Sequence, residues 1–220
     1  PLPPFPKEKL QVVDPAYFEQ ADTLMLARWL LGKYLITSIT DATTAVKITE
    51  TEAYLGTTDR ACHAFGGKKT ARTATMYLPG GHAYVYLCYG LHHLFNIVTH
   101  AAGEPHAILI RAGEPVAGIE TMLQRRQKSK PDYSLTRGPG SLAQALGLHT
   151  GHSGLPLTPP GLYIGQLRGD TQPVAIGQSA RIGVGYAGAD ALLPYRFFIP
   201  GSKWVSGGAG LNKQHHSNTP

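Results

Sequence analysis

Residues 83–99 constrain the fold most, because two strand-like runs meet there at a tight turn. The runs 83–89 (AYVYLCY) and 91–99 (LHHLFNIVT) are rich in valine, tyrosine and phenylalanine, which favour β-strands, and only Gly90 separates them. A parallel pair would need a crossover connection of a dozen residues or more. The segment therefore predicts an antiparallel hairpin that turns at Tyr89-Gly90.

The rest of the chain alternates short strand-like runs with short helical ones. The expected strands are 34–40, 45–54, 107–112 and 197–199, and residues 180–186 fit a strand or a tight loop. The expected helices are 23–31, ended by Gly32, a segment from Pro115 to Arg126, and 141–146, closed by Gly147. Because the strands are not separated by regular crossover helices, we expect a mixed α/β (α+β) fold with a curved, mainly antiparallel sheet surrounded by short helices.

Chain length and charge limit the domain organisation and the partners. The chain has 220 residues and no clear internal boundary, which predicts one domain over residues 1–206, with a proline-rich extended arm at 1–9 and a flexible tail at 207–220. Twenty Lys and Arg against 14 Asp and Glu give a net charge of +6, which favours a nucleic acid or, less often, an anionic membrane surface. No apolar run reaches membrane-spanning length, and the first residues lack the apolar region of a secretory signal.

The hairpin contains three tyrosines whose positions suggest two alternatives. Alternation along a strand places Tyr84 and Tyr86 on one face, whereas Tyr89 has the opposite parity and lies at the turn. Two aromatic rings beside a protruding aromatic tip would let a protein stack on one nucleobase and fill the gap that it leaves. The same residues are also typical of an ordinary β-core, and the pattern alone leaves both alternatives open.

The strand 45–54 offers the clearest candidates for chemistry. Glu50, Glu52 and Tyr54 share one face by parity. If that face is buried, each carboxylate needs a partner or a shifted pKa, and either state suits a general base. If the face is exposed, the segment is an ordinary solvated edge strand. Arg111 ends the apolar run AILIR, where it could neutralise such a carboxylate or point into solvent.

The segment 56–75 is expected to be a basic loop. Its lysines, arginines and hydroxyls suit contacts to phosphates, and the candidates are Lys68, Lys69, Thr70 and Arg72. A loop that is merely soluble would have the same composition. The ten histidines and two cysteines show no zinc spacing, and no nucleotide-binding motif occurs, so we expect neither a metal nor a cofactor. Cys62 and Cys88 form no paired framework, which indicates a reduced, intracellular protein.

Seven segments, in order over residues 15–206, carry a family resemblance: TETEAYLG, GGKKTARTATMY, YVYLCYGLHHLFNIV, ILIRAGEP, GPGSLAQALG, ARIGVGYAG and FFIPGSKWVS. They resemble the alkyladenine DNA glycosylases, the 3-methyladenine glycosylases of the vertebrate type. The resemblance implies a monofunctional hydrolase of DNA repair that flips an alkylated or deaminated purine from double-stranded DNA and hydrolyses its N-glycosidic bond. Expected bases are 3-methyladenine and hypoxanthine, with ethenoadenine and 7-methylguanine as further candidates, and the hairpin would project toward the DNA.

The resemblance also assigns roles to individual residues. It implies that Glu52 is the general base that activates water, and that Arg111 and the main-chain carbonyl of Ile182 help to hold this water. The base pocket would consist of Tyr54, His63, Tyr86, Asn96, Leu109 and Ile182, with Asn96 crowding the 2-amino group of guanine. Tyr89 would intercalate and Tyr84 would support the pocket, while Lys68, Lys69, Thr70 and Arg72 would contact the DNA backbone.

Three departures from the vertebrate pattern stand beside this resemblance. Leu91 and His92 replace bulky residues after the turn, and Ser141 occupies a position that is usually lysine. The vertebrate amino-terminal extension has no counterpart, which favours a compact prokaryotic form. We also expect a monomer in the cytoplasm, associated with the nucleoid. Two other functions stay open: a bifunctional glycosylase/lyase with Lys47 or Lys68 as nucleophile, and a noncatalytic binder of damaged DNA.

Overall fold

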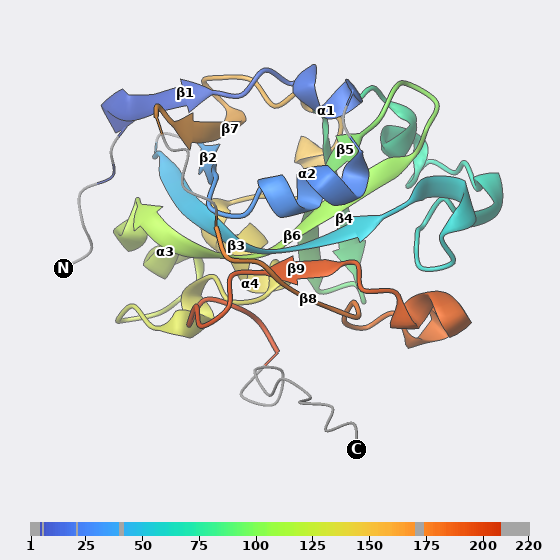
Figure 1. The fold of residues 1–220 in the computed structure, drawn as a ribbon. Coiled ribbons are helices and arrows are strands. Elements are labelled where there is room, and N and C mark those ends of the chain that lie inside the picture. Colours follow the sequence, from blue (N-terminus) through green and yellow to red (C-terminus); the bar gives the residue numbers. More distant parts are fainter. Residues whose placement is uncertain (1–4, 6, 21, 40–41, 170–173, 208–220) are drawn as a thin grey trace.

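The computed structural model describes residues 5, 7–20, 22–39, 42–169 and 174–207. Within this part of the chain, nine strands form one sheet in the order β1-β7-β2-β3-β6-β5-β4, and β9 pairs with β3 and β8 (Figure 1). All of these pairs are antiparallel. The expected mixed α/β fold with a mainly antiparallel sheet is confirmed.

The elements are short except at the centre of the sheet. The strands are β1 (Leu10–Val12), β2 (Tyr34–Thr37), β3 (Thr44–Tyr54), β4 (Ala83–Cys88), β5 (His92–Thr99), β6 (His106–Ala117), β7 (Leu162–Leu167), β8 (Gly177–Ser179) and β9 (Arg196–Phe198). The helices are α1 (Tyr17–Gln20), α2 (Thr23–Trp29), α3 (Ile119–Arg125) and α4 (Pro139–Leu146). Short 3₁₀ segments are Lys7–Lys9, Gly56–Thr58, Phe65–Gly67, Ala74–Tyr77, Tyr133–Leu135, Thr150–His152 and Gly185–Leu192.

The long strands β3 and β6 form the centre of the sheet, and α2 covers one of its faces. The hydroxyl of Thr51 in β3 donates a hydrogen bond of 2.8 Å to the carbonyl of Ala27 in α2. Ile108 and Ile110 of β6 belong to the same apolar core as Ala27. Because successive strand residues point to opposite faces, Glu52 and Leu109 lie on the face away from α2.

Local signals predicted several elements correctly. The turn of the hairpin falls at Tyr89 and Gly90, both with positive φ, between β4 and β5. The helix expected over 23–31 begins at Thr23, after Asp22, but it ends at Trp29 and not at Gly32. Gly147 ends α4 as expected, in the left-handed conformation that favours glycine. The segment 56–75 is irregular apart from short 3₁₀ turns, as expected.

The expected helix from Pro115 to Arg126 is wrong at its start. β6 continues to Ala117, and α3 begins only at Ile119 after the left-handed Gly118. Pro115 pairs with Val46 next to a register shift, an irregularity at which a strand tolerates a residue without an N–H.

Other boundaries also differ from the expectation. The strand expected over 34–40 ends at Thr37, and residues 40–41 lie outside the described part of the chain. Residues 180–186 are a loop that leads into a 3₁₀ helix, and β1, β7 and β8 were not predicted. Most of the proposed arm at 1–9 (residues 1–4 and 6) and of the tail at 207–220 (208–220) also lies outside the described residues.

Candidate active site

Residues from five neighbouring strands form one row across the face of the sheet away from α2. Arg196 of β9 pairs with Glu52 of β3, Glu52 with Leu109 of β6, Leu109 with Asn96 of β5, and Asn96 with Tyr84 of β4. Residues directly opposite each other in neighbouring strands share a face. The register therefore brings together candidates that are far apart in the sequence.

Two buried carboxylates and two buried guanidiniums lie at one end of this row. Glu50 and Glu52 are fully buried, as one of the two alternatives for this strand face predicted, and Arg111 is nearly so. Glu50 accepts hydrogen bonds from Arg111 Nε at 2.8 Å and from Arg196 Nε at 2.7 Å, and also from the main-chain N–H and hydroxyl of Ser206 at 2.6 and 2.8 Å. The four charges compensate each other, and Glu50 is held on all sides.

Glu52 is held by three groups that reach it from different segments. Oε2 accepts a hydrogen bond of 2.7 Å from the Tyr54 hydroxyl, and Oε1 accepts one of 2.8 Å from the main-chain N–H of Ile182. Arg111 Nη1 lies 3.3 Å from Oε1. Burial and the neighbouring Glu52 raise the pKa of Tyr54 well above its ordinary value, so this hydroxyl keeps its proton and remains a donor.

An aromatic cavity of about 660 Å³ lies against this cluster. Its volume falls in the range of small-molecule sites. Glu52 lies beneath the cavity wall, since its three partners Tyr54, Ile182 and Arg111 line the cavity. Other lining residues include His63, Lys68, Arg72, Tyr84, Tyr86, Tyr89, Leu94, Asn96, Leu109, Val184 and Tyr186.

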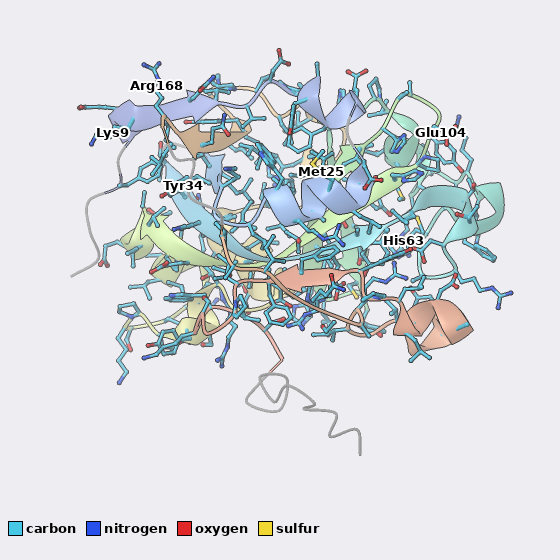
Figure 2. The ribbon with its side chains drawn as sticks, in the orientation of Figure 1. Lys9, Met25, Tyr34, His63, Glu104 and Arg168 are labelled. Carbon is cyan, nitrogen blue, oxygen red and sulfur yellow. The ribbon has the colours of Figure 1, made fainter. Side chains whose placement is uncertain are left out.

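His63, Tyr84 and Tyr86 form one wall of the cavity. The rings of His63 and Tyr86 meet edge to face with centroids 4.5 Å apart, and those of Tyr84 and Tyr86 are 5.6 Å apart. His63 Nδ1 lies 2.9 Å from the Tyr84 hydroxyl. Burial, and then the charges of Arg72 and Lys68, lower the pKa of His63 to about 4, so His63 is neutral at pH 7. In Figure 2, His63 lies at the end of the molecule away from Lys9 and Arg168, which lie beside β1.

The part of the cavity wall formed by Tyr54 and Ile182 is supported by a buried ion pair that the sequence reasoning missed. Arg181 donates hydrogen bonds of 2.5 and 2.8 Å to the two carboxylate oxygens of Asp59. The Arg181 guanidinium also lies 4.8 Å from the centre of the Tyr54 ring, and its neighbour Ile182 bonds to Glu52. The available signal was an arginine in the segment ARIGVGY, but an isolated arginine does not reveal its partner.

Asn96 and Leu109 form part of the cavity floor. The side-chain amide of Asn96 donates to the main-chain carbonyls of Tyr84, at 3.1 Å, and Leu94, at 3.4 Å. Asn96 is 3 % exposed and Leu109 2 %. These contacts hold the amide in one orientation.

The tip of the hairpin projects an aromatic ring into solvent. Tyr89 is 89 % exposed and adopts φ = 50°, a conformation that is uncommon for residues other than glycine. Leu91 follows it and is also exposed, while His92 begins β5. Tyr89 lines the mouth of the same cavity as Tyr86, although the two residues have opposite parity.

The four basic-loop candidates have different surroundings. Lys68 and Arg72 line the cavity, and the Arg72 guanidinium lies 5.0 Å from the centre of the Tyr86 ring. Lys69 instead lies 5.0 Å from the Tyr77 ring. Thr70 closes a local turn with Thr73, which donates its main-chain N–H to the Thr70 carbonyl.

Within the described part of the chain, no three His, Cys, Asp or Glu side chains are arranged to hold a metal ion. No helix among these residues has the length and apolar composition needed to cross a membrane.

A buried carboxylate behind an aromatic cavity, with an exposed tyrosine and basic side chains at its mouth, combines a candidate general base with surfaces that suit a nucleobase and a phosphate backbone. The family model for methylpurine-DNA glycosylase matches residues 17–203. The chain belongs to this family, and it is a DNA glycosylase, a hydrolase that repairs alkylation damage.

Relatives in bacteria and archaea agree with this assignment. A protein of Chlamydia felis is 46% identical over 84% of this chain and 94% of its own length. A protein of the archaeon Methanocella arvoryzae is 43% identical over 87% and 94%, and one of Oceanobacillus iheyensis is 41% identical over 86% and 93%. All three carry the name "putative 3-methyladenine DNA glycosylase". The resemblance stated from the sequence motifs is thereby confirmed at the level of the family.

Proposed function

We propose that this protein excises alkylated and deaminated purines from double-stranded DNA, with a water activated by Glu52, and leaves an abasic site. The candidate bases are 3-methyladenine and hypoxanthine first, then ethenoadenine and 7-methylguanine. The observation that carries the proposal is the position of Glu52: a buried carboxylate whose three partners, Tyr54, Ile182 and Arg111, all line the aromatic cavity.

The contacts of Glu52 support a role in activating water. Each carboxylate oxygen can accept two hydrogen bonds. Among the described contacts, Oε1 faces both Ile182 and Arg111, whereas Oε2 accepts only the Tyr54 hydroxyl. The second lone pair of Oε2 is therefore the place where the O–H of an attacking water would donate, and Glu52 would take its proton as the water attacks the sugar carbon.

The cavity walls suit a flat base that carries positive charge. The Tyr86 ring is already approached by a cation, the Arg72 guanidinium, which illustrates its capacity for cation–π contacts. A cationic alkylpurine would gain the same attraction and is already a good leaving group. Neutral hypoxanthine lacks both advantages, so its release depends more on hydrogen bonds to the purine.

The floor of the cavity supports discrimination against guanine. Asn96 is fixed by two main-chain carbonyls and lies beside Leu109. A rigid floor crowds the 2-amino group of any guanine, including 7-methylguanine. The positive charge of 7-methylguanine can offset this cost through cation–π attraction, whereas neutral guanine gains no such attraction. We therefore expect unmodified guanine to be excluded.

The exposed residues at the cavity mouth would hold the DNA. Extruding a base costs a few kcal/mol, and stacking of the exposed Tyr89 ring in the vacated space would offset about 1–3 kcal/mol of it. Lys68, Lys69, Thr70 and Arg72 would contact phosphates, which position the duplex without reading its sequence. Such an enzyme would act on the chromosome, and we propose that it does so in the cytoplasm, as a monomer.

The lyase alternative keeps one of its two candidate nucleophiles. Lys47 lines a separate cavity beside Glu114 and Trp204, whereas Lys68 lines the aromatic cavity. Treatment with borohydride in the presence of substrate would trap a Schiff base on Lys68, and a trapped complex would favour the lyase. A noncatalytic binder would retain the pocket but release no base from a hypoxanthine duplex.

The decisive experiment compares base release by the wild type, Glu52→Gln and Glu114→Gln. Glu114 lies in β6 outside the aromatic cavity and controls for the loss of one carboxylate from the same sheet. A general base contributes about 10²–10⁴-fold, so Glu52→Gln should lower the single-turnover rate on a 3-methyladenine or hypoxanthine duplex by that factor. Binding of the damaged duplex should persist, and wild-type release by Glu52→Gln would overturn the proposal.

A further inference from the structure

The Arg72 side chain lines the aromatic cavity and contacts its wall. Its guanidinium carbon is 5.0 Å from the centre of the Tyr86 ring, and its Nη2 lies 3.1 Å from His63 Nε2. Arg72 reaches this position from an exposed loop, and no carboxylate partner appears among its described contacts. The aromatic wall is therefore in contact with a planar cation supplied by the protein itself.

Tyr86 and His63 are also the residues that the proposed function assigns to the flipped base. A guanidinium is flat, positively charged and carries N–H donors, as an alkylated purine does. We propose that Arg72 is a placeholder: it occupies the base-binding wall in the free protein and must withdraw before a purine can stack on Tyr86. This inference rests on the proposed function, because it concerns how the same pocket is opened.

The contact with Arg72 also fixes the protonation pattern of His63. A guanidinium can only donate hydrogen bonds, so His63 Nε2 accepts from Arg72. The proton of the neutral imidazole then lies on Nδ1 and is donated to the Tyr84 hydroxyl oxygen at 2.9 Å. When Arg72 withdraws, Nε2 becomes an available acceptor, and it can receive an N–H of the incoming base.

Withdrawal would place the charge of Arg72 where the DNA needs it. A guanidinium that stays on Tyr86 would repel a cationic base and block a neutral one. Outside the cavity, the Arg72 guanidinium can pair with a phosphate, because Arg72 belongs to the exposed loop that also contains Lys68 and Lys69. Base entry and backbone contact would thus be coupled through one side chain, which can make only one of the two contacts at a time.

A free nucleobase separates this role from a plain phosphate contact, because it carries no phosphate. The probe is 3-methyladenine, titrated calorimetrically into the wild type, Arg72→Ala and Lys69→Ala without DNA. Loss of the competing cation–π contact and hydrogen bond should tighten binding by about threefold to thirtyfold in Arg72→Ala. Lys69→Ala removes the same charge from the same loop, but Lys69 contacts Tyr77 outside the wall, so its affinity should match the wild type.

Equal or weaker binding by Arg72→Ala would overturn the proposal, since Arg72 would then be absent from the wall or would hold the base itself. A second measurement needs no ligand: the His63 imidazole is titrated by NMR in the same variants. Loss of the adjacent Arg72 charge should raise the pKa of His63 from about 4, whereas Lys69→Ala should leave it near the wild-type value. An unchanged His63 titration in Arg72→Ala would refute the placement of Arg72 independently of Glu52→Gln and of any base release.

Discussion

Replacing Glu50 by glutamine should destabilise the fold, because Glu50 joins two guanidiniums to the chain beyond β9. Its carboxylate accepts hydrogen bonds from Arg111, Arg196 and both the main-chain N–H and hydroxyl of Ser206. Glutamine removes the negative charge. Its –NH₂ group is itself a donor, and it then faces N–H or O–H groups that the carboxylate oxygen had accepted from. Among the described residues, Arg196 then has no carboxylate partner, and Arg111 keeps only Glu52.

The size of the loss follows from how completely the pair is buried. Glu50 and Arg196 are both fully buried, and Glu50 is the only carboxylate that forms an ion pair with Arg196 in the described part of the chain. Removing one partner of such a pair costs about 3–5 kcal/mol. In a chain of this size, 1 kcal/mol corresponds to roughly 2–4 °C in Tm, so Glu50→Gln should lower Tm by about 6–20 °C.

Thermal unfolding of the wild type, Glu50→Gln and Glu52→Gln tests this reasoning. Glu52→Gln is the matched control, because glutamine can still accept from the Ile182 N–H, and Arg111 keeps its hydrogen bond to Glu50. Its Tm should therefore fall by less than that of Glu50→Gln, although its rate of base release should fall by about 10²–10⁴-fold. A Tm within about 2 °C of the wild type for Glu50→Gln, or a larger drop for Glu52→Gln, would refute the division between a structural and a chemical carboxylate.

Two further predictions concern the cavity mouth and its wall. Tyr89→Ala should weaken binding to damaged duplex by about fivefold to 150-fold, because about 1–3 kcal/mol of stacking is lost. The Tm should not change, since the ring is 89 % exposed. An equal loss of binding to undamaged duplex in a gel-shift assay would argue against intercalation. The folded-state pKa of His63, about 4, lies below its ordinary value of 6.5, so the unfolded chain binds this proton first and stability is lost as pH falls from about 6.5 toward 4. Denaturant unfolding of His63→Gln at pH 7 and pH 5 should therefore show a smaller pH dependence than the wild type, and an identical one would contradict burial of a neutral imidazole.

Features that depend on neighbouring residues could be predicted from the sequence. The two-residue period of a strand places Tyr84 beside Tyr86 and leaves Tyr89 at the turn. The same period predicts that Glu50 and Glu52 share a face, and both do contact Arg111. These inferences require no knowledge of which strands are neighbours.

Features that depend on strand order and register could not be predicted. Whether Glu50 is buried depends on Arg196 and Ser206, which lie about 150 residues later in the chain. The ion pair of Arg181 with Asp59 depends in the same way on long-range packing. The helix expected at Pro115 failed because proline is a common first residue of a helix and also fits a strand irregularity, and only pairing with β3 distinguishes these cases.

The free-energy cost of the buried charges helps to explain how this site is divided. Apolar residues of similar size often stabilise a protein as much as a buried ion pair does, so stability alone does not account for two carboxylates and two guanidiniums in the interior. Their arrangement fixes Glu52 through Arg111, while Glu50 and Ser206 hold Arg111 in turn. The proposed hydrolysis needs such a fixed carboxylate, whereas the proposed base flipping needs side chains that can move, and Tyr89 and Arg72 are exposed on a turn and a loop. In the proposed mechanism, the fixed Glu52 would hold the water and these exposed side chains would admit the base.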